Sequence, residues 1–208
     1  IANEFFDAIA IKQFRKRKNL WFEKFVNFND KKKPFFFEKI TDIKKIEKKI
    51  NFKISQNQNF IEYSELGLNY LKDISKFIKQ NNGGLLLIDY GYTNKKMKNT
   101  LKAIKNHKFA NILEDIGNVD ITHNINFNFF KKFVKQMSGL EINLTTQKDF
   151  LIKIGIKERA EIISKNLNFL KKADIFYRLK RLIDEKEMGI LFKVMLIKNY
   201  KNKFKLGF

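Results

Sequence analysis

Residues 64–92 read SELGLNYLKDISKFIKQNNGGLLLIDYGY, and the order of features in this stretch decides the fold. Ser64 is a favoured N-cap residue, and the apolar residues after it recur at intervals of three and four, which predicts a helix over 64–80. Residues 81–84, Asn-Asn-Gly-Gly, tolerate the backbone conformation that ends a helix. The run 85–88 is apolar at every position, which is typical of a strand buried on both faces of a parallel sheet. This sequence of helix, glycine turn and buried strand with a polar end predicts an α/β protein with a doubly wound sheet.

The downstream half continues the alternation. We expect helices at 129–137, 147–154, 157–164 and 167–183. We expect extended segments at 120–127 and 188–198, the second as an antiparallel edge strand. The mainly helical stretch 128–184 has two interpretations: a subdomain that faces a substrate, or helices that only pack on the sheet.

The upstream segment 11–63 has the least regular pattern. Its aromatic and β-branched residues fall in short strand-like pieces, at 11–15, 21–28, 35–38 and 60–63. A helix is expected at 41–49, with Thr41 as its N-cap. We therefore expect 11–63 to be an irregular insertion that contains β-hairpin-like pieces.

Charge is the most unusual property of the composition. The 208 residues include 43 Lys and Arg against 22 Asp and Glu, a net charge of +21. Such a charge suits nucleic acid, an anionic membrane surface or an acidic partner. However, only five of the basic residues are Arg, and Lys, Asn, Ile and Phe all use A/T-rich codons, so an AT-rich genome explains the excess of Lys. Because nucleic-acid interfaces favour Arg, we expect no nucleic-acid partner, and a basic nucleic-acid-binding module is kept as an alternative.

The composition also excludes several kinds of chemistry. Cysteine is absent, which removes disulfides, Cys-based zinc sites and a Cys nucleophile. His107 and His123 are the only histidines, so a His-rich metal site is not expected. No apolar run approaches the roughly 18 residues of a membrane span, so no transmembrane segment is expected.

Asn3-Glu4-Phe5-Phe6-Asp7 is the first motif that carries chemistry. It follows Ile1-Ala2, which reads as the end of a strand, and we therefore expect the chain to be incomplete at its N-terminus. After a buried strand, this motif lies at the carboxyl end of a parallel sheet, where ligands bind in open α/β folds. The carboxylates of Glu4 and Asp7 can hold a guanidinium or orient an amine toward a methyl donor. The alternative is that they satisfy amide groups at a helix N-terminus.

Two further motifs contain polar residues at strand ends. Asp89, Tyr90 and Gly91 close the apolar strand, and Gly91 is expected to let the backbone turn sharply there. If the strands before the two motifs are neighbours, Asp89 and Tyr90 emerge beside the first motif; the alternative is a plain strand–turn junction.

In the third motif, Asp120 and Thr122 share one face of an extended segment. His123, which follows them, has no visible partner, and such a histidine is usually structural rather than a general base.

Taken together, these residues resemble the MidA family of methyltransferases, the group that includes the mitochondrial complex I assembly methyltransferase. The resemblance runs from residue 1 to about 198 and rests on pieces in matching order. The first pieces are Asn3 to Ala8, Gln13-Phe14, Trp21 with Glu23, Gly84 to Gly91, Thr100 to Ala103 with His107, and Asp120 to Thr122. The later ones are Thr146 to Leu151, Gly155 to Ala160, Arg181 to Ile183, Glu187 to Gly189, and Phe192-Lys193.

The resemblance implies a seven-stranded, Rossmann-like methyltransferase sheet, here incomplete because the N-terminal strands are lacking. It implies S-adenosylmethionine as cofactor, a class I enzyme, and a protein arginine as methyl acceptor, for example in a respiratory complex I subunit. Its location would be the cytoplasm in bacteria or the mitochondrial matrix in eukaryotes, and a homo-oligomer is left open.

Site roles follow from the same resemblance. The catalytic residues would be Asn3, Glu4 and Asp7, and the cofactor contacts would be Asn3 and Phe5. Substrate would be bound by Asp89, Tyr90, Gly91, Asp120 and Thr122.

Two departures accompany the resemblance. The family's glycine-rich loop and its ribose-binding acid match no residue of this chain, so this part alone is expected to be inactive. The family also usually has Asp where this chain has Asn126, and commonly His or Asp at the position of Asn124. A chain that acts only as an interaction partner is therefore the other alternative.

Overall fold

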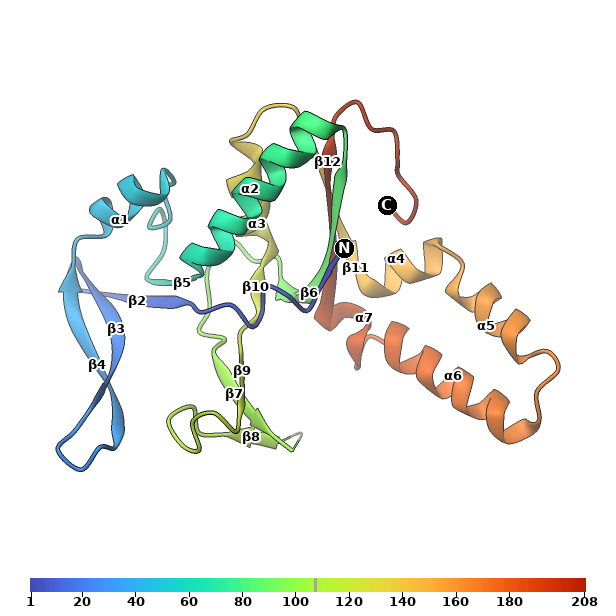
Figure 1. The fold of residues 1–208 in the computed structure, drawn as a ribbon, viewed down its shortest axis with the longest axis horizontal. Helices are drawn as coiled ribbons and strands as arrows, with labels where there is room; N and C mark the ends of the chain where they lie inside the picture. Colours follow the sequence, from blue (N-terminus) through green and yellow to red (C-terminus); the bar gives the residue numbers. More distant parts are fainter. Residues whose placement is uncertain (107) are drawn as a thin grey trace.

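A computed structural model describes residues 1–106 and 108–208 (Figure 1). At its centre is a five-stranded sheet in the order β1-β6-β12-β11, with β10 also pairing β6. The strands are β1 (Ala2–Asn3), β6 (Gly84–Tyr92), β10 (Ile125–Asn126), β11 (Leu140–Thr146) and β12 (Phe192–Asn199). β1 and β10 run parallel to β6, whereas β12 is antiparallel to both β6 and β11. The α/β class is therefore confirmed, with a mixed sheet at its centre.

The helix, turn and strand expected within residues 64–92 form as α2, the turn after it, and β6. Helix α2 (Glu65–Asn81) is capped by Ser64, whose hydroxyl accepts a hydrogen bond of 2.9 Å from the Gly67 amide. The helix ends at Asn82, which has a positive φ of 52°. Its residues Leu68, Leu71 and Ile78 are buried against the sheet.

Helix α3 (Phe127–Lys135) lies beside α2 on the same side of the sheet, as Figure 1 shows. Phe127, Phe129, Phe130 and Phe133 are all buried, so one face of this short helix is almost entirely aromatic. α2, α3 and the sheet enclose the main core.

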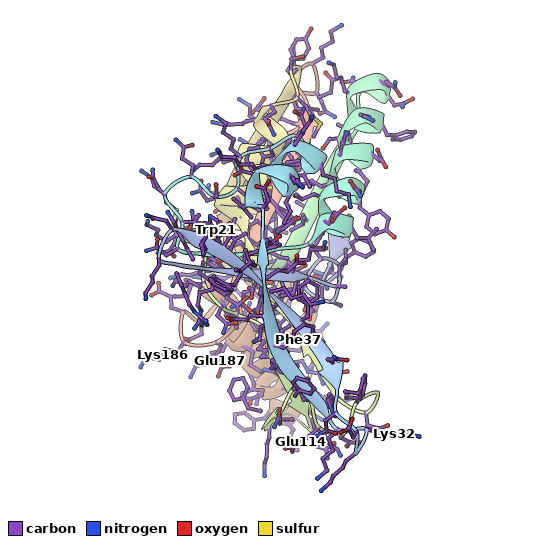
Figure 2. All side chains as sticks on the ribbon, turned by 90° about the vertical axis from the view of Figure 1, so that its left-hand side faces the viewer. Trp21, Lys32, Phe37, Glu114, Lys186 and Glu187 are labelled. Carbon is purple, nitrogen blue, oxygen red and sulfur yellow. The ribbon has the colours of Figure 1, made fainter. Side chains whose placement is uncertain are left out.

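The segment 11–63 is more regular than its sequence indicates. It contains a four-stranded antiparallel sheet in the order β4-β3-β2-β5. The elements are β2 (Lys12–Arg17), β3 (Leu20–Phe28), β4 (Pro34–Thr41), α1 (Ile43–Ile50) and β5 (Phe60–Tyr63). β3 and β4 continue outward as a twisted ribbon, with Phe37 along it and Lys32 at its far end (Figure 2). The N-cap of α1 is Asp42 rather than Thr41, since the Asp42 carboxylate accepts from the Lys44 amide.

Three expectations about the downstream half need correction. Residues 140–146 were not expected to form a strand, but they form β11. This strand lies at the edge of the central sheet, the position that was expected for the last strand. Residues 188–191 are a helical turn, α7 (Met188–Leu191), so the last strand starts at Phe192. A small three-stranded sheet, unforeseen as a sheet, has the order β8-β7-β9 and consists of β7 (Lys102–Lys105), β8 (Lys108–Ala110) and β9 (Asp120–Thr122).

The expected C-terminal helices are present as α4 (Gln147–Lys153), α5 (Ile156–Ser164) and α6 (Phe169–Ile183). Figure 1 shows α5 and α6 as an antiparallel pair that projects away from the sheet, and no residue of α6 is buried. Among the described residues, no helix has the length and apolarity needed to cross a membrane.

Gly91 lies inside β6 and not at a sharp turn. A Cβ atom at this position would come within 2.4 Å of both the Ile125 carbonyl oxygen and the Phe127 ring. The physical reason for glycine here is therefore the close approach of β10 and the start of α3, in place of the turn expected from the sequence.

Candidate functional site

Two of the predicted motifs lie side by side because β1 pairs with β6. The parallel register places Ala2 opposite Leu87 and Asn3 opposite Ile88. The Glu4 amide then donates a 2.9 Å hydrogen bond to the Ile88 carbonyl, after which the chain turns away from the sheet. The expectation that the two motifs follow adjacent parallel strands is confirmed. We call residues 3–7 the acidic turn.

The side chain of Asp89 anchors the acidic turn. One carboxylate oxygen accepts from the amides of Phe6 (3.1 Å) and Asp7 (3.3 Å), and the other accepts from the Tyr90 amide (2.8 Å). Asp89 is fully buried, and these bonds engage both of its carboxylate oxygens. Asp89 thus holds the acidic turn in place, and the direct contact with a substrate expected from the sequence stays a prediction.

The acidic turn presents some of its side chains to solvent and buries others. Asn3 and Glu4 are exposed, and Glu4 has a positive φ of 46°, which is uncommon for a residue with a Cβ atom. The Phe5 ring is 44% exposed, whereas Phe6 is buried in the core. Asp7 is only 5% exposed, so the turn offers one exposed carboxylate, which accepts from the Asn3 side-chain amide (3.3 Å), and one that is nearly buried.

Tyr90 forms part of the same rim. It is half-buried, its ring packs on Phe192 with centroids 4.1 Å apart, and the Lys102 ammonium lies 5.2 Å from the ring centroid. Burial and the nearby negative charges of Glu4, Asp7 and Asp89 raise the pKa of the Tyr90 phenol, so it stays a hydrogen-bond donor at neutral pH.

Burial sets the protonation of the two aspartates. It raises the pKa of Asp7, and the neighbouring Glu4 charge raises it further, against smaller opposing contributions from a backbone hydrogen bond and from Lys102. Burial and then the Asp7 charge raise the pKa of Asp89 from 3.8 to about 7, although three amide donors favour its ionised form. Both carboxyl groups are therefore stronger bases than an exposed aspartate.

The third motif reaches the site through His123. Its amide donates to the Asp7 carbonyl (3.0 Å), and the imidazole is 7% exposed. Burial lowers the pKa of His123, which keeps the ring neutral, and its Nε2 atom has no hydrogen-bond partner among the described residues. His123 therefore supports the acidic turn through its backbone, while its side chain is a neutral neighbour of Asp7.

Thr122 and Asp120 lie further along β9. Thr122 is half-buried and stands opposite Lys102, whereas Asp120 is exposed and stands opposite Ile104. In the described part of the chain, no hydrogen bond or ion pair links Asp120 to the acidic turn. His107, one of the residues behind the resemblance, lies outside the described residues.

Sequence reasoning missed a buried polar network beside the site. The Glu62 carboxylate accepts from the side chain of Gln13 (2.6 Å) and from both the amide (3.2 Å) and the hydroxyl of Thr100. The Thr100 hydroxyl also accepts from the Asn124 amide (2.8 Å), so the network joins the four-stranded sheet to the strand before α3. The sequence signal that could have indicated this network is the position of Glu62 between Ile61 and Tyr63, whose side chains are buried.

Removing this carboxylate should destabilise the fold strongly. Glu62→Ala removes the acceptor of the Thr100 amide and of one N–H of the Gln13 side chain, whose other N–H still donates to Asn99 (2.8 Å), so we expect the free energy of unfolding to fall by roughly 2–3 kcal/mol. Urea denaturation measures this. The control is Glu38→Ala, which breaks a partly exposed pair with Arg17 and should cost about 1 kcal/mol or less. Equal losses in the two variants would contradict the structural role of Glu62.

The raised pKa of Asp89 predicts an unusual pH dependence of stability. The native state holds the Asp89 proton up to about pH 7, while the unfolded chain releases it near 3.8. The free energy of unfolding should therefore fall as pH rises through this interval, by on the order of 3 kcal/mol between pH 5 and 8. Asp89→Asn should remove this part of the slope in urea denaturation, and Asp30→Asn, at an exposed turn, should leave it unchanged. A slope that survives in Asp89→Asn would show that Asp89 ionises normally.

The fold and the site define the class of protein. It is an α/β protein with a site of acidic and aromatic residues at the carboxyl ends of two adjacent parallel strands. Residues 1–146 match the model of a family described as "Putative S-adenosyl-L-methionine-dependent methyltransferase". The chain belongs to this family, which confirms the resemblance seen in its sequence.

Curated relatives carry a more specific name. The chain is 25% identical over 203 residues to the mitochondrial protein arginine methyltransferase NDUFAF7 of Danio rerio, covering 96% of this chain and 47% of that protein. It is 29% identical over 161 residues to the corresponding homolog of Caenorhabditis elegans, covering 76% of this chain and 38% of that protein. The chain thus spans about half the length, or less, of the curated relatives it matches.

Solved structures share the fold. Two crystal structures of proteins from Burkholderia thailandensis superpose with TM-scores of 0.80 and 0.79, at 22% and 21% identity. Each superposition covers 99% of this chain and 56% or 54% of the other chain. The second of these proteins, described as a "likely methyl transferase", has S-adenosyl-homocysteine bound.

Proposed function

We propose that this chain forms the acceptor side of an S-adenosylmethionine-dependent methyltransferase that modifies an arginine of a protein. The observation that carries the proposal is the acidic turn. Glu4 and Asp7 stand at the carboxyl end of β1, beside Tyr90 at the end of β6, and Asp89 holds them there. This is where open α/β sheets bind their ligands.

The acidic turn suits the methyl-donor end of the cofactor. S-adenosylmethionine supplies a methyl group on a positively charged sulfonium, and a carboxylate and an aromatic ring are both favourable neighbours for a cation. The partly exposed Phe5 ring provides such a neighbour, and the exposed Asn3 amide offers a hydrogen-bonding group beside it. In our proposal Asn3 and Phe5 contact the donor.

Glu4 and Asp7 act on the acceptor. Paired charge-assisted hydrogen bonds from the guanidinium to these carboxylates fix the arginine with one nitrogen lone pair facing the methyl group. As the new nitrogen–carbon bond forms and the sulfur–carbon bond breaks, the nitrogen must lose a proton. Asp7 receives it in this proposal, because burial raises the pKa of its carboxyl group.

The remaining predicted site residues have different roles, according to their surroundings. Tyr90 and Thr122 line the rim and contact substrate in our proposal, and exposed Asp120 meets the substrate protein further out. Asp89 acts as a positioning residue through the acidic turn, and Gly91 acts by allowing β10 to approach.

The sheet of the active enzyme extends beyond β1 in this proposal. Among the described residues β1 pairs only with β6, so its other edge is open. Phe5 contacts Tyr70 (5.8 Å between ring centroids), and exposed Leu66 and Phe77 continue the apolar surface along the same face of α2. We propose that the cofactor-binding strands and glycine-rich loop pair with this edge and complete a seven-stranded sheet.

Partners and location are extensions of the same proposal. A protein substrate is inferred from the names of the arginine methyltransferase relatives. By the family resemblance it is a respiratory complex I subunit, with the enzyme in the mitochondrial matrix of a eukaryote or the cytoplasm of a bacterium. The helices within 128–184 are proposed to face the substrate, since α5 and α6 project from the sheet.

Methyl transfer from labelled S-adenosylmethionine tests the proposal. The complete gene product should transfer the label to a protein of its own cell extract, and peptide mass spectrometry should place one added methyl group on an arginine. Transfer to lysine or to a small molecule would overturn the arginine assignment. No transfer by a preparation that binds S-adenosyl-homocysteine would overturn the enzyme assignment.

A further inference from the structure

A long groove, away from the acidic turn, runs along the surface between α1, α2 and α3. It consists of two adjoining cavities of about 790 and 320 Å³, which share Asn51 and Gln136. Eight lysines line it, and we call it the lysine groove: Lys44, Lys48, Lys53, Lys72, Lys76, Lys79, Lys95 and Lys132.

The charge of the lysine groove exceeds what the composition explains. The whole chain has about two basic residues for each acidic one, whereas the described lining contains eight lysines and one carboxylate, Glu47. That carboxylate is already occupied, because it accepts from the amides of Ile54 and Ser55 at 2.8 Å. Within the described residues, none of the five lysines of the larger cavity is in an ion pair; they are Lys44, Lys48, Lys53, Lys95 and Lys132. The positive field of the larger cavity is thus uncompensated, while in the smaller one Lys76 pairs with Asp73 (3.7 Å).

Two uncharged features also favour an anionic, hydrogen-bonding ligand. The N-terminus of α3 opens on the larger cavity at Asn126, Asn128 and Phe129, and its dipole attracts negative charge. The lining also offers exposed side chains that can hydrogen-bond to a ligand, at Asn51, Gln136 and Ser138.

The chemistry of the lining favours a polypeptide over a nucleic acid. No arginine lines either cavity, so the paired donors that recognise phosphates and guanine are missing from the described lining. The rings of Phe52 and Phe129 pack on each other, 5.5 Å apart, and Phe129 is buried, so no open ring platform for stacked bases is formed. Side-chain amides, including Asn51, Gln56 and Gln136, can pair with a peptide backbone.

We infer that the lysine groove binds an acidic segment of a partner protein. The carboxylates of that segment pair with the lysines, and its backbone meets the amide side chains. This inference goes beyond the proposed methyl transfer and does not depend on it, because the groove is formed by α1, α2 and α3 without the acidic turn.

Fluorescence anisotropy with the whole chain tests the inference. The probe is a labelled peptide of alternating Glu and Ser, compared with the same peptide carrying Gln for Glu and with a labelled single-stranded RNA of similar length. We expect the acidic peptide to bind at least about tenfold more tightly than the Gln peptide at moderate salt, and the preference to shrink as salt rises. Tighter binding of the RNA to the groove would overturn the choice of a polypeptide.

Charge-reversal variants locate the binding. Lys48→Glu, Lys95→Glu and Lys132→Glu together should weaken acidic-peptide binding by at least about tenfold. The matched control carries the same charge change on exposed lysines of α5, α6 and the turn between them, Lys157→Glu, Lys171→Glu and Lys165→Glu, and should retain most of the affinity. Circular dichroism checks that both triple variants fold. Equal weakening in the two would mean that net charge alone is responsible, and would overturn the site.

Discussion

Glu4→Gln should reduce the turnover of the complete enzyme by about two to three orders of magnitude. The substitution keeps the size and hydrogen-bonding reach of the side chain but removes the exposed negative charge that we assign to the guanidinium. Cofactor affinity should change little, because Asn3, Phe5 and the parts of the enzyme that bind adenosine are untouched. Turnover is measured with labelled S-adenosylmethionine, and cofactor affinity by calorimetry with S-adenosyl-homocysteine.

The control for Glu4→Gln is Glu114→Gln, the same chemical change at an exposed residue just before the β9 strand. It should leave turnover at the wild-type level. Unchanged turnover in Glu4→Gln would remove Glu4 from the mechanism. A loss of cofactor affinity in parallel with turnover would instead place Glu4 in the cofactor site.

Gly91→Ala should have the largest effect on folding, a loss of about 3 kcal/mol or more in the free energy of unfolding. The added methyl group would lie 2.4 Å from the Ile125 carbonyl and from the Phe127 ring. Neither can move easily, since Ile125 pairs with Gly91 in the sheet and Phe127 is fully buried. Thermal and urea denaturation measure the loss.

Gly84→Ala is the matched control, because Gly84 is in the same strand and its new methyl group would be no closer than 3.5 Å to any neighbour. This variant should be close to wild type. If Gly91→Ala were as stable as the wild type, β10 and α3 would have to pack less tightly against β6 than they do in the structure.

Local signals were sufficient for the central part of the fold. The α2–β6 unit followed from a cap residue, a helical period and a fully apolar run, and each of these acts over a few residues. β11 was missed although Leu140, Ile142 and Leu144 alternate with polar residues, since a period of two over so few residues is a weak signal. The strand order could not be predicted from the sequence, because no local sequence signal places β12 between β6 and β11.

The sequence indicated the position of the acidic turn and of Tyr90 better than the residues that support them. Glu4, Asp7 and Tyr90 were proposed as site residues because strand ends in an α/β sheet are where polar residues gather. The anchoring role of Asp89 and the Glu62 network depend on hydrogen bonds between residues 38 to 83 positions apart, and no sequence period reports these.

One departure from the family pattern has a structural explanation. Asn126 is the N-cap of α3, and its side-chain oxygen accepts from the Phe129 amide at 3.0 Å. Asp serves equally well at an N-cap, so Asn preserves this structural role. The Asn126 amide group also donates to the Asn94 carbonyl at 3.3 Å, a bond that Asp could not make when ionised.

A crystal structure of the complete gene product with S-adenosyl-homocysteine tests most directly whether the acidic turn lies at the site of methyl transfer. The ligand's sulfur should lie against the acidic turn of residues 3–7, with Glu4 and Tyr90 around the space where a guanidinium would enter. A ligand bound at the β11 edge, or one separated from Glu4 by the sheet, would contradict the assignment.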